Sequence, residues 1–252
     1  MNHIVVIGFM GSGKTRVGKR LSSDLGLTFV DVDKVIVKKM NMSVKEILQK
    51  FGEPYYRALE TMTVKALIED KERKVISLGA GLPVQEQNEQ YIKQLGTVVY
   101  LKGSAETLRK RLEGNSNPLL EGENQDEKIK KLLKQRDPIY HKFADVEVVT
   151  GVKPFEELIK EIEGQRILDK IPEGSFVIPL CIEGTPYSTE QFQKKWDQWN
   201  KESINNITFI IGGSLGLSPK VVSKGKLKLS FSRMTFPHQL MRLILIEQLS
   251  YL

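Results

Sequence analysis

The stretch that decides the fold reads Gly8-Phe9-Met10-Gly11-Ser12-Gly13-Lys14-Thr15. It fits the pattern G-x-x-x-x-G-K-[ST] of a phosphate-binding loop, and it follows an apolar run at residues 4–7 that predicts a strand. Glycines let the backbone wrap around phosphate groups, whose charge is favoured by exposed N–H groups and a helix N-terminus. Lys14 is expected to reach the β- and γ-phosphates, and Thr15 to ligate Mg²⁺. A dinucleotide loop, G-x-G-x-x-G, is disfavoured because position 16 is arginine.

Outward from this loop, short β-branched runs alternate with longer helical patterns. Strands are expected at residues 3–8, 28–32, 74–78, 97–101 and 146–150. Helices are expected at residues 53–70, 104–113 and 125–137, and the aperiodic residues 114–126 are interpreted as a mobile loop. Such alternation is typical of an α/β fold, here a P-loop parallel sheet with helices on both faces.

A second, smaller α/β organisation is expected after residue 150. Helices are predicted at residues 154–171, 189–203 and 237–251, and strands at 176–183, 207–211 and 226–232. No linker rich in Pro, Gly or Ser separates the halves, so the first of these helices is expected to end one domain and begin the other. We predict domains at residues 1–164 and 165–252.

Composition limits the partners. The 252 residues are 40% hydrophobic and 27% charged, which predicts a globular protein. Residues 165–252 hold 11 Lys and Arg against 7 Asp and Glu, so +4 of the net charge of +7 lies there, which permits RNA as a partner. Cys181 is the only cysteine, which excludes an intrachain disulfide and fits a reducing compartment. Without an apolar run of roughly 18 residues, we expect no membrane contact and a cytoplasmic location.

Candidate residues for a phosphate acceptor follow the second and third predicted strands. Asp31 and Asp33 close the second strand, where parallel sheets bind ligands, and their spacing would point them to opposite sides of a strand. One carboxylate could serve Mg²⁺ and the other a substrate hydroxyl. Arg57 and Glu60, spaced i,i+3, suit a substrate site or a structural ion pair. The Gly-Ala-Gly sequence at residues 79–81 allows a ligand to approach the backbone closely.

Six segments occur in the order found in shikimate kinases, a family that residues 1–164 resemble. The segments are residues 8–15 (GFMGSGKT), 29–33 (FVDVD), 52–60 (GEPYYRALE), 77–81 (SLGAG), 118–120 (PLL) and 136–145 (RDPIYHKFAD). The resemblance implies phosphorylation of the shikimate 3-hydroxyl by ATP with Mg²⁺. It further implies that Asp33 acts as base, that Arg57 and Arg136 clamp the substrate carboxylate, and that Asp31 holds Mg²⁺ through water.

These expectations define the first site. Catalytic roles fall to Lys14, Asp33 and Arg136. ATP binding falls to Gly8, Gly11, Ser12, Gly13, Lys14, Thr15 and Arg111. Substrate binding falls to Asp33, Arg57, Gly79, Ala80, Gly81 and Arg136, and metal binding to Thr15 and Asp31. Gluconate-type kinases share the loop. Asp33, Arg57 and Arg136 together favour shikimate over a neutral sugar, because a carboxylate on the acceptor explains two arginines.

Two residues depart from the family. Ala80 adds a methyl group where the family has glycine, and Asn117 stands where the family carries an arginine that neutralises ATP phosphates. Asn117 therefore predicts weaker ATP binding or slower turnover, unless Arg109, Lys110 or Arg111 takes over this task.

A second glycine loop, residues 212–217, follows the strand predicted at 207–211 and suits either a ligand site or a tight turn. With residues 163–168 (EGQRIL) and 229–242 (LSFSRMTFPHQLMR), it resembles ribosomal-RNA large-subunit methyltransferase H, of the knotted SPOUT class. The resemblance implies a knot, a homodimer, an rRNA substrate and bound S-adenosylmethionine. The residues expected to enclose this cofactor are Gly212, Gly213, Leu215, Gly216, Ser230 and Met234.

This second resemblance lacks two parts of that family, its N-terminal βα portion and its C-terminal tail. We therefore expect a shikimate kinase joined to a degenerate, incomplete methyltransferase part. One alternative is a bifunctional enzyme that also methylates rRNA, and another is a nucleotide-gated RNA-binding protein.

Overall fold

The computed structural model describes residues 2–113, 124–213 and 215–252. The chain divides into two compact units, Met1–Ile159 and Lys160–Leu252, and the division falls inside helix α8 (Phe155–Leu168). The domain boundary predicted after residue 164 lies in the same helix and stays a prediction. The loop predicted at residues 114–126, with Asn117, falls almost entirely outside the described residues.

The first unit is built on a five-stranded sheet with the strand order β2-β3-β1-β4-β5, and all its pairings are parallel. The strands are β1 (His3–Gly8), β2 (Thr28–Asp31), β3 (Lys74–Ser77), β4 (Gly96–Gly103) and β5 (Val146–Thr150). Each corresponds to a strand predicted from the sequence. The predicted parallel α/β sheet is therefore confirmed.

Helices connect these strands. They are α1 (Lys14–Leu25), α2 (Val32–Met40), α3 (Val44–Phe51), α4 (Glu53–Ile68), α5 (Glu89–Leu95), α6 (Ala105–Leu112) and α7 (Gln125–Phe143), with the 3-10 turns η1 (Leu82–Val84) and η2 (Glu86–Asn88). Helices α2, α3 and α5 were not predicted from the sequence. Helices α2 and α3 begin at side-chain caps, because Asp31 accepts from the backbone N–H of Lys34 and Ser43 forms a capping box with Glu46.

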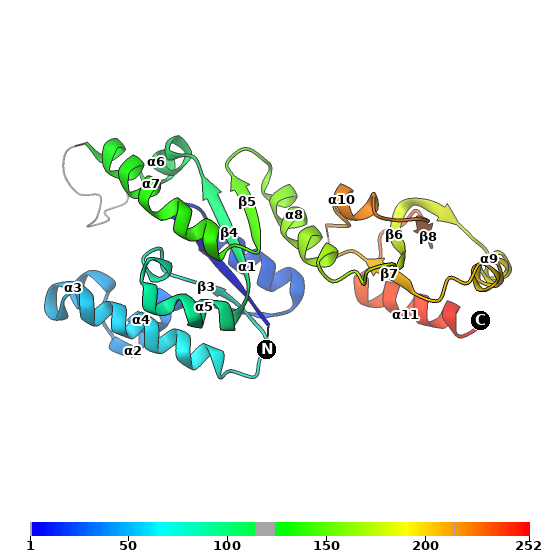
Figure 1. Cartoon of the computed structure of the whole chain (residues 1–252), viewed down its shortest axis with the longest axis horizontal. Coiled ribbons are helices and arrows are strands. Elements are labelled where there is room, and N and C mark those ends of the chain that lie inside the picture. The colour runs from blue at the N-terminus through cyan, green and yellow to red at the C-terminus, as the bar shows by residue number, and fades with distance from the viewer. Residues whose placement is uncertain (1, 114–123, 214) are drawn as a thin grey trace. The chain divides into compact units, whose positions relative to one another are not determined.

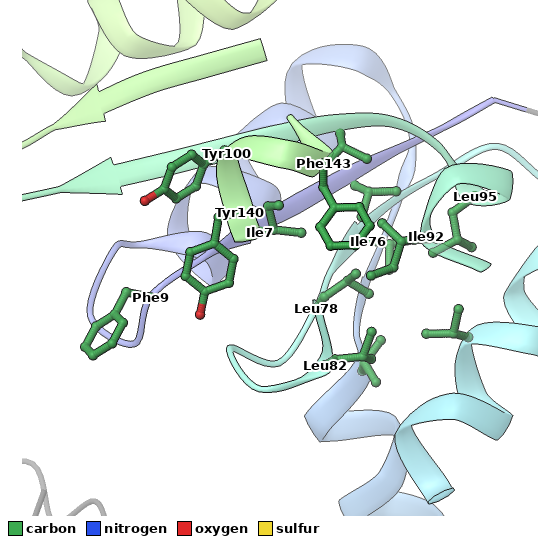
Figure 2. Packing of buried hydrophobic residues seen from close by; sticks show 14 of the residues in the cluster. Ile7, Phe9, Ile76, Leu78, Leu82, Ile92, Leu95, Tyr100, Tyr140 and Phe143 are labelled. Atoms are coloured by element: carbon green, nitrogen blue, oxygen red, sulfur yellow. The ribbon is translucent and has the colours of Figure 1, made fainter. Parts of the chain in front are cut away.

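Both faces of this sheet are covered. On one face Ile7, Ile76 and Tyr100 pack with Ile92 of α5 and Phe143 of α7, as Figure 2 shows. In β1, the residues between those that face α5 and α7 are buried as well, so the opposite face of the sheet must also be covered. Figure 1 shows α1 on the side of the sheet away from α5 and α7. This arrangement places the carboxyl end of β1 next to the N-terminus of α1.

Two differences from the predicted boundaries in the first unit concern residues of the predicted site or helix α7. Strand β2 ends at Asp31, and Asp33 lies in the first turn of α2, so the two aspartates do not alternate along a strand. The capping bond of Asp31 starts the helix there and ends the strand. Helix α7 continues through Pro138 to Phe143, although proline removes one helical hydrogen bond. Burial of Tyr140 and Phe143 in the core favours this continuation.

The second unit holds a three-stranded parallel sheet with the order β7-β6-β8. Its elements are β6 (Phe176–Pro186), α9 (Thr189–Lys201), β7 (Ile207–Ile211), α10 (Pro219–Val222), β8 (Leu229–Ser230) and α11 (His238–Leu249). Its core includes Ile178, Phe192 and Trp199. Strand β8 is shorter than predicted, because β6 shifts register opposite Leu229. Among the helices of the described residues, none has the length and apolar character of a membrane span.

Candidate active site

The phosphate loop joins β1 to α1. Gly8 has φ +147°, and a Cβ there would lie 2.7 Å from the Leu101 carbonyl oxygen and 2.8 Å from Ser12 Oγ. Gly13, the N-cap of α1, has φ 98°, a left-handed conformation that favours glycine. Ser12 Oγ is buried without a hydrogen-bond partner among the described residues. A buried, unsatisfied hydroxyl in such a loop suits an anionic ligand that accepts its hydrogen bond.

Lys14 lies at the centre of this loop. Its Nζ donates to the carbonyl oxygens of Gly8 and Phe9, both at 3.0 Å. Burial lowers the pKa of Lys14 to about 8; Asp33 and Asp31 oppose the shift and Arg136 adds to it. Three charged groups expected at the site therefore interact electrostatically with this ammonium group. A polyphosphate at the same place would favour its protonated form.

ATP binding is expected to take up a proton above pH 8, because phosphate charges raise the depressed pKa of Lys14. The sign follows from linkage: the bound state holds more protons, so affinity falls as pH rises through about 8, by at most tenfold per unit. Calorimetry at pH 8.5 in two buffers of different ionisation enthalpy measures this uptake. AMP, which lacks the β- and γ-phosphates, is the control ligand. If the observed heat of ATP binding were the same in the two buffers after subtraction of the heats of dilution, the prediction would be wrong.

Thr15 and Asp31 form the expected metal position. Thr15 Oγ1 donates to Asp31 Oδ2 at 2.9 Å, which joins the start of α1 to the end of β2. Within the described ranges, no group of three or more His, Cys, Asp or Glu side chains could hold a metal by itself. Mg²⁺ in phosphoryl-transfer sites needs only one or two protein oxygens beside phosphates and waters. One hydroxyl and one carboxylate fit this requirement.

A cavity of about 460 Å³ continues from the loop. Its lining includes Ser12, Gly13, Arg16, Arg111, Thr150 and Phe155. Arg111 Nη1 donates to the carbonyl oxygens of Gly11 and Ser12 at 3.3 and 3.2 Å. Arg109 and Lys110, by contrast, pair with Glu113 and Glu106 on their own helix. Of these three cations, Arg111 is therefore the one placed to contact a nucleotide.

Replacing Arg111 with alanine is expected to raise the KM for ATP about tenfold, since a hydrogen bond to a charged group contributes about 1.5 kcal/mol or more. Initial rates at saturating acceptor measure the effect. Lys110→Ala, one position away in the same helix, is the matched control and should leave the KM unchanged. Equal effects of the two substitutions would show that Arg111 acts only through general surface charge.

The acceptor side of the site is organised around the loop after β3. A Cβ at Gly79 would lie 2.6 Å from Glu60 Oε1 and 2.8 Å from Asp33 Oδ1, so both carboxylates press against this glycine. Tyr56 of α4 donates its hydroxyl to Asp33 Oδ1 at 2.7 Å. Burial raises the pKa of Glu60 to about 7, although the Arg57 guanidinium opposes the shift.

Arginines border the same loop. A Cβ at Gly81 would lie 2.5 Å from Arg57 Nη1, so the guanidinium packs on the backbone. Arg57 also pairs with Glu53 at 2.7 Å and Glu60 at 2.8 Å, which confirms the structural ion pair as one of its roles. Arg136 Nη1 of α7 is buried without a hydrogen-bond partner among the described residues. Arg136 thus keeps donor capacity for an anionic ligand.

The structure therefore brings most of the predicted first site together, and it adds two residues. Tyr56 holds Asp33, and Tyr140 donates to the Ala80 carbonyl oxygen at 2.6 Å. Neither tyrosine was assigned from the sequence, because a tyrosine in an amphipathic helix also suits the core. Asn117, the second departure from the family, lies outside the described residues.

In the second unit, a cavity of about 320 Å³ adjoins the second glycine loop. Its lining includes Gly212, Gly213, Leu215, Gly216 and Met234, all predicted as cofactor-binding residues. Ser230, predicted with them, lines a neighbouring cavity of about 350 Å³ instead, whereas Ile182, Glu183 and Ser232 line both. Ser214 lies outside the described residues.

Family models match both parts of the chain. One described as "Shikimate kinase" matches residues 10–165, and one described as "Predicted SPOUT methyltransferase" matches residues 119–251. A shikimate kinase of Thermodesulfovibrio yellowstonii is 43% identical over 167 residues, 65% of this chain and 96% of that protein. The structure titled "Shikimate kinase from Acinetobacter baumannii in complex with shikimate" aligns with a TM-score of 0.63 and 34% identity, over 68% of this chain and 96% of the other.

The C-terminal part has its own relative. Ribosomal RNA large subunit methyltransferase H of Bifidobacterium animalis subsp. lactis is 50% identical over 91 residues, 36% of this chain and 57% of that protein. The chain thus spans little more than half the length of this relative. The chain belongs to the shikimate kinase family in its N-terminal part and to the SPOUT methyltransferase family in its C-terminal part.

Proposed function

We propose that the first unit transfers the γ-phosphate of ATP to the 3-hydroxyl of shikimate. The observation that carries the proposal is the buried Nη1 of Arg136, which has no partner among the described residues. An unpartnered guanidinium nitrogen suits a carboxylate, and Arg57 packs on Gly81 in the loop after β3. The shikimate named in the Acinetobacter baumannii structure is an acid of this kind and supports the choice.

The residues then take the following roles. Asp33, oriented by Tyr56, accepts the proton of the attacking hydroxyl. Arg57 and Arg136 orient the substrate carboxylate. Lys14 stays in contact with the oxygens of the transferred phosphoryl group and stabilises their negative charge. Mg²⁺, held by Thr15 and through water by Asp31, would neutralise charge on the β- and γ-phosphates.

A coupled ADP-release assay tests the function. Shikimate, its methyl ester, gluconate and a no-acceptor control are compared with ATP and Mg²⁺. Turnover is expected with shikimate. The KM for the methyl ester is expected to be about tenfold higher or more, because the ester lacks the charge that the two arginines bind. Equal use of gluconate or of the ester would contradict the assignment of the acceptor.

As a second candidate function, we propose that the cavity beside the glycine loop of the second unit binds S-adenosylmethionine. Its volume of about 320 Å³ fits the lower range of small-ligand sites. A Cβ at Gly212 would lie 2.8 Å from the carbonyl carbon of Gly216, so the backbone at the beginning of the loop lies close to the backbone near its end. Family membership and these contacts support cofactor binding. The bifunctional alternative adds a second step, in which the second unit transfers the methyl group of the bound cofactor to rRNA.

Gly212→Ala is expected to reduce binding of S-adenosylmethionine about tenfold or more, because its Cβ displaces the backbone of Gly216. Lys224→Ala is the control, since this exposed residue lines neither cavity of the second unit. Calorimetry with the full chain measures both. Binding that is equally strong in the wild type and both variants would place the ligand elsewhere, and no binding to the wild type would end this second proposal.

The predicted homodimer and the predicted rRNA partner stay predictions for the second unit. Leu240, Leu243 and Ile246 on α11 are exposed by 41%, 62% and 53%, and burial of such side chains would favour self-association. Light scattering at micromolar concentration decides this point, and a monomer would contradict the dimer. Binding to rRNA fragments that weakens with salt would support the RNA contact.

A further inference from the structure

Tyr140 connects two parts of the acceptor site that are distant in sequence. It belongs to α7, its side chain is fully buried, and its hydroxyl donates to the Ala80 carbonyl oxygen at 2.6 Å. Its ring packs against Tyr100, with centroids 5.3 Å apart. Figure 2 shows the two hydroxyls pointing in different directions. The Tyr100 hydroxyl donates to Asp137 instead.

The carbonyl that Tyr140 binds lies in the middle of the substrate loop, defined here as residues 79–81. On one side of it, Gly79 is in contact with the carboxylates of Asp33 and Glu60. On the other side, Gly81 is in contact with the guanidinium of Arg57. A displacement of the loop therefore changes the position of the side chains that pack on it. A hydrogen bond to its central carbonyl restrains that displacement.

The same helix carries Arg136, four residues before Tyr140 and so on the same face. The hydroxyl of Tyr140 stays protonated at neutral pH, since burial raises its pKa to about 12 while Arg136 opposes the shift. Tyr140 is therefore a constant donor. The helix that presents one proposed carboxylate ligand, Arg136, is tied through this bond to the loop that packs on the other, Arg57.

We infer that Tyr140 is a positioning residue, which fixes the substrate loop to α7 and so sets the spacing between Arg136 and Arg57 for the acceptor carboxylate. The inference rests on the proposed function of the first unit. It assigns Tyr140 to acceptor binding and not to the chemical step, because its hydroxyl bonds to the Ala80 carbonyl oxygen and to the Arg136 side chain. The expected signature is a change in the KM for shikimate with little change in kcat.

Tyr140→Phe tests this role, because it removes only the hydroxyl and keeps the buried ring. The KM for shikimate is expected to rise about five- to tenfold, the value of one hydrogen bond, with kcat and the KM for ATP within about twofold. Tyr100→Phe is the matched control. It removes a buried hydroxyl from the same aromatic pair, whose partner is Asp137, and should leave the KM for shikimate within about twofold of the wild type.

Hydrogen exchange of residues 79–84 gives a readout that does not need activity. The N–H groups of Leu82 and Val84 donate to the Gly79 and Gly81 carbonyls at 3.1 and 3.2 Å. Exchange there is expected to be several-fold faster in Tyr140→Phe than in Tyr100→Phe. Equal exchange in the two variants overturns the inference, whether or not shikimate is the acceptor. Faster exchange in a protein that does not turn over shikimate would keep the restraint and reject the proposed acceptor.

Discussion

Replacing Lys14 with alanine is expected to lower kcat for ADP release by roughly 10²–10³-fold or more, since removing a preorganised donor from developing negative charge has this effect. Its ammonium group lies between the carbonyls of Gly8 and Phe9, and Asp31 and Asp33 interact with it electrostatically. The side chain is thus held where the loop wraps around phosphate groups. Alanine removes the one cation of the loop motif and leaves two carbonyl oxygens without this donor.

The matched control is Lys19→Ala, an exposed lysine in the same helix α1. It changes the net charge equally and should leave kcat within about twofold, as surface substitutions usually do. Circular dichroism and thermal unfolding show whether the Lys14 variant is folded. A folded Lys14→Ala protein with wild-type turnover would mean that the nucleotide phosphates bind elsewhere.

The phosphate site was predictable from the sequence because its parts are local. Glycines at fixed spacing, a β-branched run before them and a helical pattern after them specify strand, loop and helix within about a dozen residues. Strands β1, β3 and β4 were predictable for the same reason, since buried parallel strands are continuous apolar runs, and the edge strands β2 and β5 are short runs rich in β-branched or aromatic residues. Both the phosphate loop and these strands could be predicted because they depend on residues that are close in sequence.

The geometry of the acceptor site was less predictable, because it depends on contacts between distant residues. The N-cap role of Asp31 competes with strand extension, and only the structure shows that the capping bond is formed and that the helix begins at Val32. Tyr56 and Tyr140 lie in helices whose apolar faces already explain an aromatic side chain. Their hydroxyl partners, Asp33 and the Ala80 carbonyl, are 23 and 60 residues away. No periodicity encodes such pairs.

The second unit shows the same division between local and long-range information. Strand β7 and helix α9 lie where the sequence predicted them, because a run of β-branched and aromatic residues and a capping box at Ser188 are local signals. Strand β8 was predicted too long, since its end depends on the register of β6. Ser230 accordingly lines a different cavity from Gly212. The resemblance to a methyltransferase family indicated the class of ligand for the second unit. The assignment of Ser230 and Gly212 to two different cavities could be seen only in the structure.

Replacing Asp33 with asparagine is expected to lower kcat for shikimate phosphorylation by about 10²–10⁴-fold, the usual contribution of a positioned general base. Asparagine keeps the size of the side chain, so its contact with Gly79 can remain. It loses the negative charge and one acceptor, so that the substrate hydroxyl has no base. Because Arg57 and Arg136 are unchanged, the KM for shikimate should move far less than kcat.

Asp31→Asn is the informative comparison, since this neighbouring carboxylate is bonded to Thr15 Oγ1 at 2.9 Å and is proposed to act through Mg²⁺. Its loss of activity should be partly restored by a higher Mg²⁺ concentration, because the metal site is weakened and the base is intact. The loss in Asp33→Asn should not respond to Mg²⁺, because metal cannot replace a proton acceptor. Recovery of both variants by Mg²⁺ would assign Asp33 to the metal site, and near wild-type kcat in Asp33→Asn would limit Asp33 to binding the hydroxyl.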